Sequence, residues 1–320
     1  MRFQTQAALC ALTLAVTACN TPGEGQARPV EGQEVEWIGP QGPEPYDPNI
    51  TKDRRKAGAV LADIDKSLRI WNNILLTGSA AKDGSTLNIV EADLRRKVNS
   101  KLPMLLEQLE TGPPINRQIA AASMGFSDGT RVLGPLLAAL DDDSPEVVAN
   151  ALLGLSILRD PATPRIPLAS KLEDVQQTLA VRNNAARALR AVGLLGLEEA
   201  DRAAVIRAGR AALGDPEEGL RPSGALILAE VADTDSIPEL SRALTDPTPL
   251  VARAASRALA RIGSVEPEFK GKAARALTSV LNSVDPERVR PSILKDLQAL
   301  AGKNYGDDIE EWVRYAQKLP

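Results

Sequence analysis

The sequence predicts an all-α protein whose body is a right-handed α-solenoid of stacked helix pairs. From residue 51 onward, apolar residues recur at spacings of three and four, the period of an amphipathic helix. Before residue 300, β-branched runs are short and never alternate with polar residues, so strands and hairpins are not expected. A related segment also returns six times along the chain, as it does in proteins built from repeated helix pairs.

The first residues have the pattern of an export signal. Arg2 precedes an apolar stretch, Ala7 to Ala18, that is too short to cross a bilayer as a helix. The stretch ends in Val16-Thr17-Ala18-Cys19, which resembles the lipobox of bacterial lipoproteins. The resemblance implies that residues 1–18 are removed and that Cys19 carries a lipid anchoring the protein to a membrane of the cell envelope. Asn20, in place of Asp, implies the outer membrane facing the periplasm if the source is Gram-negative. The alternative is an ordinary secretory signal in which Cys19 is incidental.

Residues 19–50 are expected to form a disordered tether. Between residues 20 and 49 there are six Pro and five Gly but few aliphatic residues, so this stretch cannot bury enough apolar area to offset its chain entropy. Trp37 and Tyr46 are its aromatic residues. They either pack against the first helix or form a short partner-binding motif.

Residues 51–112 are expected to form an N-terminal helical cap of two helices. In the first, Ala57, Val60, Leu61, Ile64, Leu68, Trp71 and Leu75 make one apolar face. The second is expected from about Leu87 to Leu109, with a possible break near Pro103 because proline removes a helix hydrogen bond.

The region 113–320 is expected to stack six helix pairs. The clearest copy of its repeat, Val181 to Gly193, reads VRNNAARALRAVG, and a second, Val251 to Gly263, reads VARAASRALARIG. Weaker copies begin at Asn116, Val147, Leu220 and Val289, so the six starts lie 31, 34, 39, 31 and 38 residues apart.

These copies resemble HEAT repeats, particularly the short bacterial kind. In that family an acidic turn with proline precedes a first helix of the form V-R-x-x-A-A-x-A-L-x-x-hydrophobic-G, and a second helix follows. The turns here are Asp143-Ser144-Pro145, Asp215-Pro216, Asp246-Pro247 and Asp285-Pro286. The resemblance covers roughly residues 100–320. Together with the lipobox, it implies a bacterial HEAT-repeat lipoprotein whose second helices line a concave surface that binds proteins.

The residues of the pattern have structural explanations. Small alanines allow neighbouring helices to approach, while Leu189 and Val192 fill the interface. An Asp before Pro is expected to cap a helix N-terminus, and Gly193 and Gly263 suit helix ends with positive φ. One repeat position holds Arg117, Arg182, Arg221 and Arg290. We expect these arginines to bond to a turn Asp or a carbonyl between repeats; a ligand-binding basic stripe is the alternative.

The C-terminal segment, Gly302 to Tyr315, is rich in aromatic residues and resembles the closing segment of bacterial HEAT proteins. It is expected to cap the exposed end of the solenoid with a helix that contains Trp312. An aromatic platform for a sugar or a peptide is the alternative.

The composition argues against several kinds of enzyme. The chain has no His, which removes Ser-His-Asp catalysis and His-ligated zinc or haem, and it has no glycine-rich phosphate loop. Ser292-Ile293-Leu294-Lys295 fits the S-x-x-K of some serine hydrolases, but Ile293 and Leu294 are expected in the core. Asp141-Asp142-Asp143 lacks the spacing of a calcium loop. We therefore expect no catalytic residue, no metal and no cofactor.

Two classes of function remain at this stage. The first is a lipid-anchored scaffold or adaptor of the envelope that binds a protein or peptide, with Arg242, Lys272 and Arg275 on the second helices as candidate ligand-binding residues. These cations do not share a repeat register, so a solvated face is their alternative role. The second class is an enzyme or an accessory subunit similar to lyase-like HEAT-repeat proteins. Nucleic acid is not an expected partner, because the net charge is −4 and the pI is about 5.3.

Overall fold

The computed structural model describes residues 48–77, 84–194 and 196–320, and side chains from residue 56 onward. Within these residues every regular element is a helix, so the predicted all-α class is confirmed. Residues 49–320 form one compact unit. The predicted signal, Cys19 and almost all of the predicted tether lie outside the described residues. No helix of the described chain combines the length and the apolar character needed to cross a bilayer.

Two long helices, α1 (Pro48–Leu76) and α2 (Gly84–Thr111), form an N-terminal hairpin. They run antiparallel: Lys97 Nζ lies 2.8 Å from Asp63 Oδ2, and the Trp71 indole donates to Glu91 Oε1 at 3.1 Å. The predicted apolar face is buried at Leu61, Ile64 and Trp71, among other positions. The predicted break at Pro103 is wrong. Helix α2 continues through Pro103 because buried leucines on both sides of it keep the helix packed.

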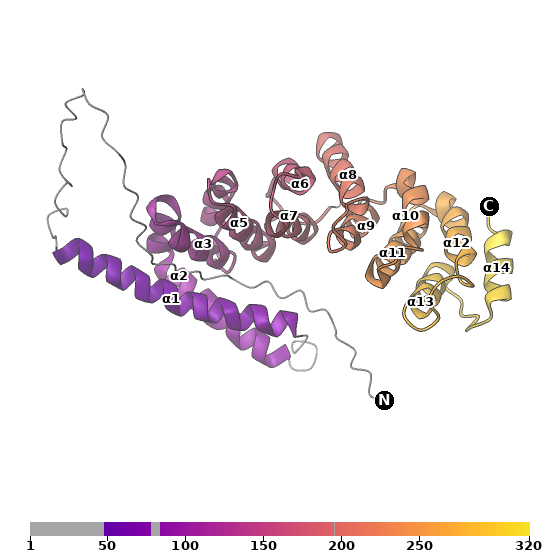
Figure 1. Cartoon of the computed structure of the whole chain (residues 1–320), viewed down its shortest axis with the longest axis horizontal. Coiled ribbons are helices and arrows are strands. Elements are labelled where there is room, and N and C mark those ends of the chain that lie inside the picture. The colour runs from indigo at the N-terminus through magenta and orange to yellow at the C-terminus, as the bar shows by residue number, and fades with distance from the viewer. Residues whose placement is uncertain (1–47, 78–83, 195) are drawn as a thin grey trace, which may run out of the picture. The chain divides into compact units, whose positions relative to one another are not determined.

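Six helix pairs follow the hairpin. Their first helices are α3 (Pro114–Met124), α5 (Pro145–Leu158), α7 (Leu179–Ala191), α9 (Arg221–Glu230), α11 (Pro249–Val265) and α13 (Arg290–Ala301). Their second helices are α4 (Leu133–Ala138), α6 (Arg165–Glu173), α8 (Glu199–Leu213), α10 (Ile237–Ala243), α12 (Lys270–Ser279) and α14 (Ile309–Lys318). Each first helix packs against the first helix of the next pair. In Figure 1, α7, α9, α11 and α13 form a lower row beneath α8, α10 and α12. The predicted solenoid is confirmed.

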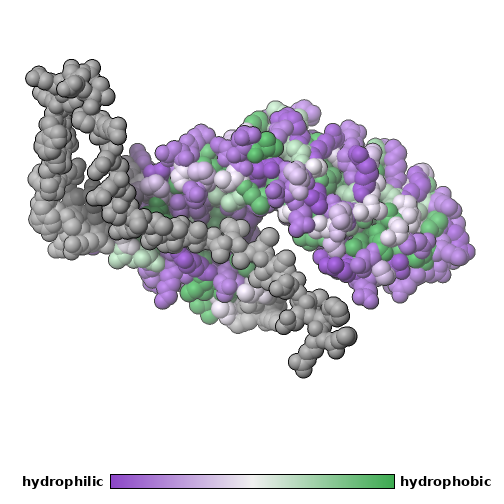
Figure 2. Space-filling model, viewed as in Figure 1, coloured by the Kyte–Doolittle hydropathy of each residue, from purple (hydrophilic) through white to green (hydrophobic). Residues whose placement is uncertain are grey.

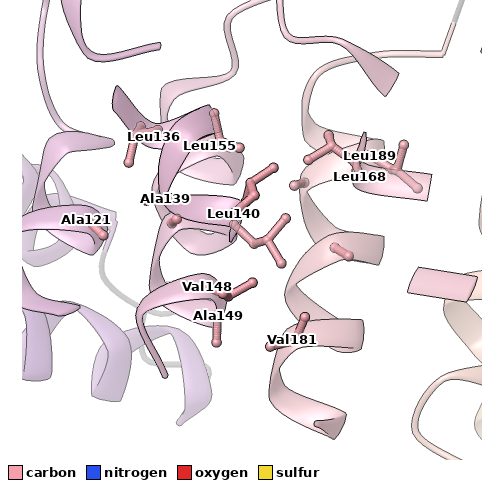
Figure 3. Packing of buried hydrophobic residues seen from close by; sticks show 14 of the residues in the cluster. Ala121, Leu136, Ala139, Leu140, Val148, Ala149, Leu155, Leu168, Val181 and Leu189 are labelled. Atoms are coloured by element: carbon pink, nitrogen blue, oxygen red, sulfur yellow. The ribbon is translucent and has the colours of Figure 1, made fainter. Parts of the chain in front are cut away.

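Small and branched side chains fill the space between consecutive pairs (Figure 3). Leu189 is fully buried and Val192 is 5% exposed, which confirms their predicted place in the interface. Gly154 shows how close the first helices come, because a Cβ at this position would overlap the carbonyl oxygen of Ala121 on the preceding first helix. Helices this close together make dense van der Waals contact. Larger residues in place of Gly154 and Ala121 would force the two helices apart.

Two predictions about local geometry are corrected. Gly193 has the expected positive φ of 81°, but Gly263 lies inside α11, where a Cβ would meet Ala273 Cβ at 2.9 Å. Gly263 is therefore required by close packing. The Asp residues before Pro do not cap the following helices. The carboxylates of Asp215, Asp246 and Asp285 each accept a backbone N–H bond from two residues later within the turn, and in the first of these turns Asp142 does so in place of Asp143.

The C-terminal segment closes the last pair, as predicted. Trp312 is fully buried and donates its indole N–H to the Gly306 carbonyl at 3.0 Å. The Tyr305 ring meets Trp312 edge to face, with 4.9 Å between the ring centroids. Asp308 caps α14 by accepting from the Glu311 amide. These contacts cover the apolar side of the sixth helix pair.

Replacing Leu189 by Ala is expected to lower the free energy of unfolding by about 2–5 kcal/mol, because a buried leucine is lost and a cavity remains. Leu179→Ala, at a position 42% exposed on the same helix, is the matched control and should cost much less. Denaturant unfolding followed by circular dichroism measures both. A loss under about 1 kcal/mol for Leu189→Ala would show that this interface is not packed as described.

Candidate functional site

The arginines that share one repeat position join neighbouring repeats. Arg117 donates two hydrogen bonds to the Asp142 carboxylate, at 2.8 and 2.9 Å, and Arg221 pairs in the same way with Asp246. Arg182 pairs with Asp215, and both side chains are buried. The predicted bonding between repeats is confirmed for these three arginines. We call the three pairs the arginine–aspartate ladder.

Arg290 occupies the same repeat position but differs from the others. Its Nε is buried and has no hydrogen-bond partner within the described part of the chain. The partner of a ladder arginine comes from the turn before the next first helix, and α13 is followed by the C-terminal cap instead of another first helix.

The ladder also lowers the pKa of one of its carboxylates, that of Asp142. Burial alone would raise the pKa of Asp142, but hydrogen bonds from Arg117 and from the Ser144 backbone amide hold the pKa below its ordinary value. Arg117, Arg182 and Arg221 are each bound to a carboxylate of the protein itself. None of these three arginines is therefore free to bind a ligand.

The three cations predicted to bind a ligand lie on neighbouring second helices. Arg242 is exposed on α10 and lies 3.4 Å from Glu239. Lys272, on α12, stands over the Phe269 ring at 4.9 Å from its centroid. Arg275 donates to the carbonyl oxygens of Ala316 and Leu319 and so holds the C-terminal end against α12. All three residues are exposed, and Arg275 also has a structural contact with the C-terminal end.

The other motifs from the sequence are accounted for by packing and pairing. Ile293 is fully buried, as expected, and no hydrogen bond joins Ser292 to Lys295 in the residues described. Asp141 lies 3.5 Å from Lys171, while Asp142 and Asp143 both pair with Arg117. The acidic triplet thus takes part in contacts between repeats.

A cavity of about 650 Å³ is lined by the N-terminal hairpin and by the C-terminal ends of three first helices with the turns after them, and no residue of a second helix lines it. The hairpin contributes Trp71, Glu91 and Arg95. The other lining residues are 125–128 in the turn after α3, 156–159 at the end of α5, and 187, 190 and 191 at the end of α7. Trp71 and Phe126 meet edge to face at 5.4 Å between their centroids. The cavity therefore has a lining of mixed charged, polar and apolar residues, with the largely buried rings of Trp71 and Phe126 at its base.

The positive charges at this cavity are poorly balanced. Arg187 lies over the Trp71 ring at 5.6 Å from its centroid. Desolvation lowers the pKa of Arg187, and the positive charge of Arg159 lowers it further, although part of the side chain reaches solvent. Arg95, Arg159 and Arg187 have no carboxylate partner among the described residues. The nearby acids are engaged elsewhere: Glu91 accepts from Trp71, and Asp128 from Asn99.

A second cavity, of about 350 Å³, continues the same surface over α7, α9 and α11. Arg190 lines both cavities and donates to Glu230 at 3.0 Å, while Arg257 and Arg261 line only the second. Leu194 and Leu226 give this cavity apolar walls. We call this surface the cationic face, and its members are Arg95, Arg159, Arg187, Arg190, Arg257 and Arg261.

The cationic face has a repeat register that sequence reasoning missed. Arg187, Arg257 and Lys295 each stand six residues after the start of their copy, whereas Ala122, Leu153 and Leu226 take that position in the other three copies. On α11, Arg253, Arg257 and Arg261 recur every four residues and are the only exposed side chains between Val251 and Gly263. Aligning the copies by their exposed positions, rather than by their core positions, would have revealed this signal.

The fold and this surface place the protein among the α-solenoids, with charged cavities along its stacked first helices. Residues 206–298 match the family model for HEAT repeats, which confirms the predicted resemblance for the stretch from α8 to α13. Among solved structures, a designed armadillo repeat protein is 23% identical, with a TM-score of 0.46, over 62% of this chain and 99% of that chain. No curated protein matches this chain.

The buried pair in the ladder yields a stability prediction. Asp215→Ala is expected to cost about 3–5 kcal/mol, because Arg182 would remain buried without its counter-charge. Removing both charges with Arg182→Met and Asp215→Ala should recover part of that loss. Arg69→Ala, which breaks the exposed pair with Asp65, is the control and should cost less than about 1 kcal/mol. Equal losses for the buried and the exposed pair, measured by chemical unfolding, would contradict this account of the ladder.

Proposed function

We propose that this protein is a lipid-anchored scaffold or adaptor of the bacterial cell envelope that holds a protein or peptide partner. Helical-repeat solenoids of this kind commonly bind proteins, because stacked repeats present a long continuous surface. The observation that carries the proposal is the cationic face, where exposed arginines without carboxylate partners surround two cavities. No arrangement in the described residues specifically favours the alternative of an enzyme.

The character of the remaining surface supports the same proposal. Hydrophilic residues cover most of the surface visible in Figure 2, and the hydrophobic residues there form small separate areas. Large exposed apolar side chains are dispersed over different helices, such as Ile115, Ile166 and Leu250. Charge and shape are therefore the properties by which this surface can distinguish one partner from another.

Attachment to the envelope rests on the first residues of the sequence. The Val16-Thr17-Ala18-Cys19 pattern supports a lipid on Cys19, and the Pro- and Gly-rich residues after it would hold the solenoid away from the membrane. Asn20 supports the outer membrane, facing the periplasm, if the source is Gram-negative. A lipid on one cysteine would keep the partner close to the membrane surface without a membrane-spanning helix.

The anchor is tested by Cys19→Ser. This variant is expected to be exported but to carry no lipid, because the acceptor thiol is absent. Cells are labelled with a clickable fatty acid, and the label on the immunoprecipitated protein is compared with that on Cys10→Ser, which changes a cysteine inside the signal and should keep full labelling. Equal label on wild type and Cys19→Ser would reject Cys19 as the anchor.

The scaffold function is tested with the soluble Cys19→Ser form. Chemical cross-linking in an envelope extract, followed by mass spectrometry, is expected to return one dominant protein partner at stoichiometric yield. The second-helix hypothesis is tested in the same experiment: it predicts that Arg242→Glu with Lys272→Glu abolishes the cross-link and leaves the melting temperature unchanged. Recovery of no specific partner across growth conditions would contradict a scaffold role.

A further inference from the structure

We propose that the cationic face binds an extended acidic segment of the partner protein, with one apolar or aromatic side chain of that segment seated in the cavity beside Trp71. The inference rests on the proposed function in taking the partner to be a protein, and it adds the site and the chemistry of recognition. It places the site on the first helices, whereas the sequence had pointed to the second helices.

The charges on this face call for an anionic ligand. In a chain of net charge −4, five arginines of the cationic face form no ion pair with a carboxylate in the described residues: Arg95, Arg159, Arg187, Arg257 and Arg261. Asp296 is near enough to Arg257 for their charges to attract, and its carboxylate accepts a hydrogen bond from Ser256. Guanidinium groups bind carboxylates through paired, charge-assisted hydrogen bonds. The ladder arginines already make such bonds to carboxylates within the protein. The five arginines of the cationic face do not, so their guanidinium groups can bind the carboxylates of a ligand.

The backbone at Arg159 supports a role for its side chain. Arg159 ends α5 with φ 53°, a left-handed conformation that glycine adopts at least cost. The turns that follow α7 and α13 use Gly193 and Gly302 for the same purpose, and the turn after α9 uses Ala232, with φ 50°. A side chain at this position in α5 therefore costs stability, and it places a guanidinium at the rim of the larger cavity.

The shape of the face fits an extended chain. Packed helices lie about 8–10 Å apart, so the first helices from α5 to α11 span about 30 Å, which about nine extended residues can cover. Alternate side chains of such a chain point the same way. Acidic side chains in that set can then meet the arginines, while an apolar side chain at another position of the same set enters the cavity beside Trp71 and Phe126.

These cavities favour a peptide over an anionic membrane surface. Both are recessed and carry apolar wall residues, Phe126 in the larger and Leu226 in the smaller. Side chains of a peptide can fill such recesses at defined spacings, whereas lipid headgroups present mobile charge without apolar side chains at that level. The register of Arg187 and Arg257 on alternating repeats also matches a ligand with a regular backbone.

The probe is a fluorescein-labelled peptide of about twelve residues, all glutamate except for one central phenylalanine. Its binding to the full chain carrying Cys19→Ser is measured by fluorescence anisotropy. Saturable binding that weakens as NaCl rises is expected, because exposed charges are screened. A peptide with lysine in place of glutamate should not bind, and replacing the phenylalanine by serine should weaken binding.

Two triple variants of identical charge change separate the two faces. The test variant carries Arg95→Glu, Arg257→Glu and Arg261→Glu on the cationic face. The control carries Arg131→Glu, Arg242→Glu and Lys272→Glu, at exposed cations on the side of the second helices. We expect the test variant to bind the glutamate peptide at least about tenfold more weakly and the control to bind within about twofold of wild type. Arg187→Gln, which removes one charge over Trp71, should also weaken binding, and circular dichroism melting verifies that each variant is folded.

Three results would overturn the inference: no binding of the glutamate peptide, equal loss in both triple variants, or loss only in the control. Flotation with vesicles of phosphatidylcholine and phosphatidylglycerol in equal parts tests the membrane alternative. Binding to these vesicles that depends on the cationic face, without peptide binding, would assign the face to a membrane instead.

If an envelope partner is cross-linked equally to wild type and the test variant, the scaffold function stands and this inference fails. If the test variant alone loses the peptide but no partner is ever recovered, the inference stands and the scaffold function fails.

Discussion

The structure depends on how closely consecutive first helices pack. A single helix pair cannot bury its apolar face, so each repeat is stable only when the next repeat covers it. The small side chains of Ala121 and Ala185 and the bare backbone of Gly154 make that approach possible, and larger residues such as Leu155 and Leu189 then fill the remaining space. Hydrophobic burial between repeats thus replaces the single compact core of a globular domain.

The arginine–aspartate ladder fixes the relative position of neighbouring repeats, which the nonpolar packing alone does not. Apolar contacts alone permit small shifts between helices, whereas the paired bonds of Arg117 to Asp142 and of Arg221 to Asp246 have one satisfactory geometry. The ladder ends at Arg290, where the segment containing Trp312 covers the last pair in place of another repeat. The same repeat position therefore serves in stacking inside the solenoid and has no carboxylate to meet at its end.

Close packing also determines where function can reside. The first helices are so deeply buried that α11 exposes only Arg253, Arg257 and Arg261 between Val251 and Gly263. The side chains on such a narrow exposed line contribute little to folding, so they are the ones that can be chosen for binding. The N-terminal hairpin then adds Trp71 and Arg95 to the arginines of α5 and α7, and this turns a charged surface into a cavity.

The sequence by itself determined the all-α class, the six repeats, the interface leucine at Leu189 and the bonding role of Arg117, Arg182 and Arg221. These features repeat along the chain, and each depends on neighbours at a fixed spacing, so periodicity was enough to find them. It also raised the lipid anchor at Cys19, which remains a proposal.

Only the tertiary structure decided that Gly263 is a packing contact, that α2 continues through Pro103, and that Arg275 holds the C-terminal end. It also brought Trp71 and Arg95 beside Arg187, residues about ninety or more positions apart in the chain, because the hairpin folds back onto the ends of α3, α5 and α7. Periodicity reports how a residue relates to its own helix, whereas a cavity depends on which distant elements meet, and that is settled only when the whole chain packs.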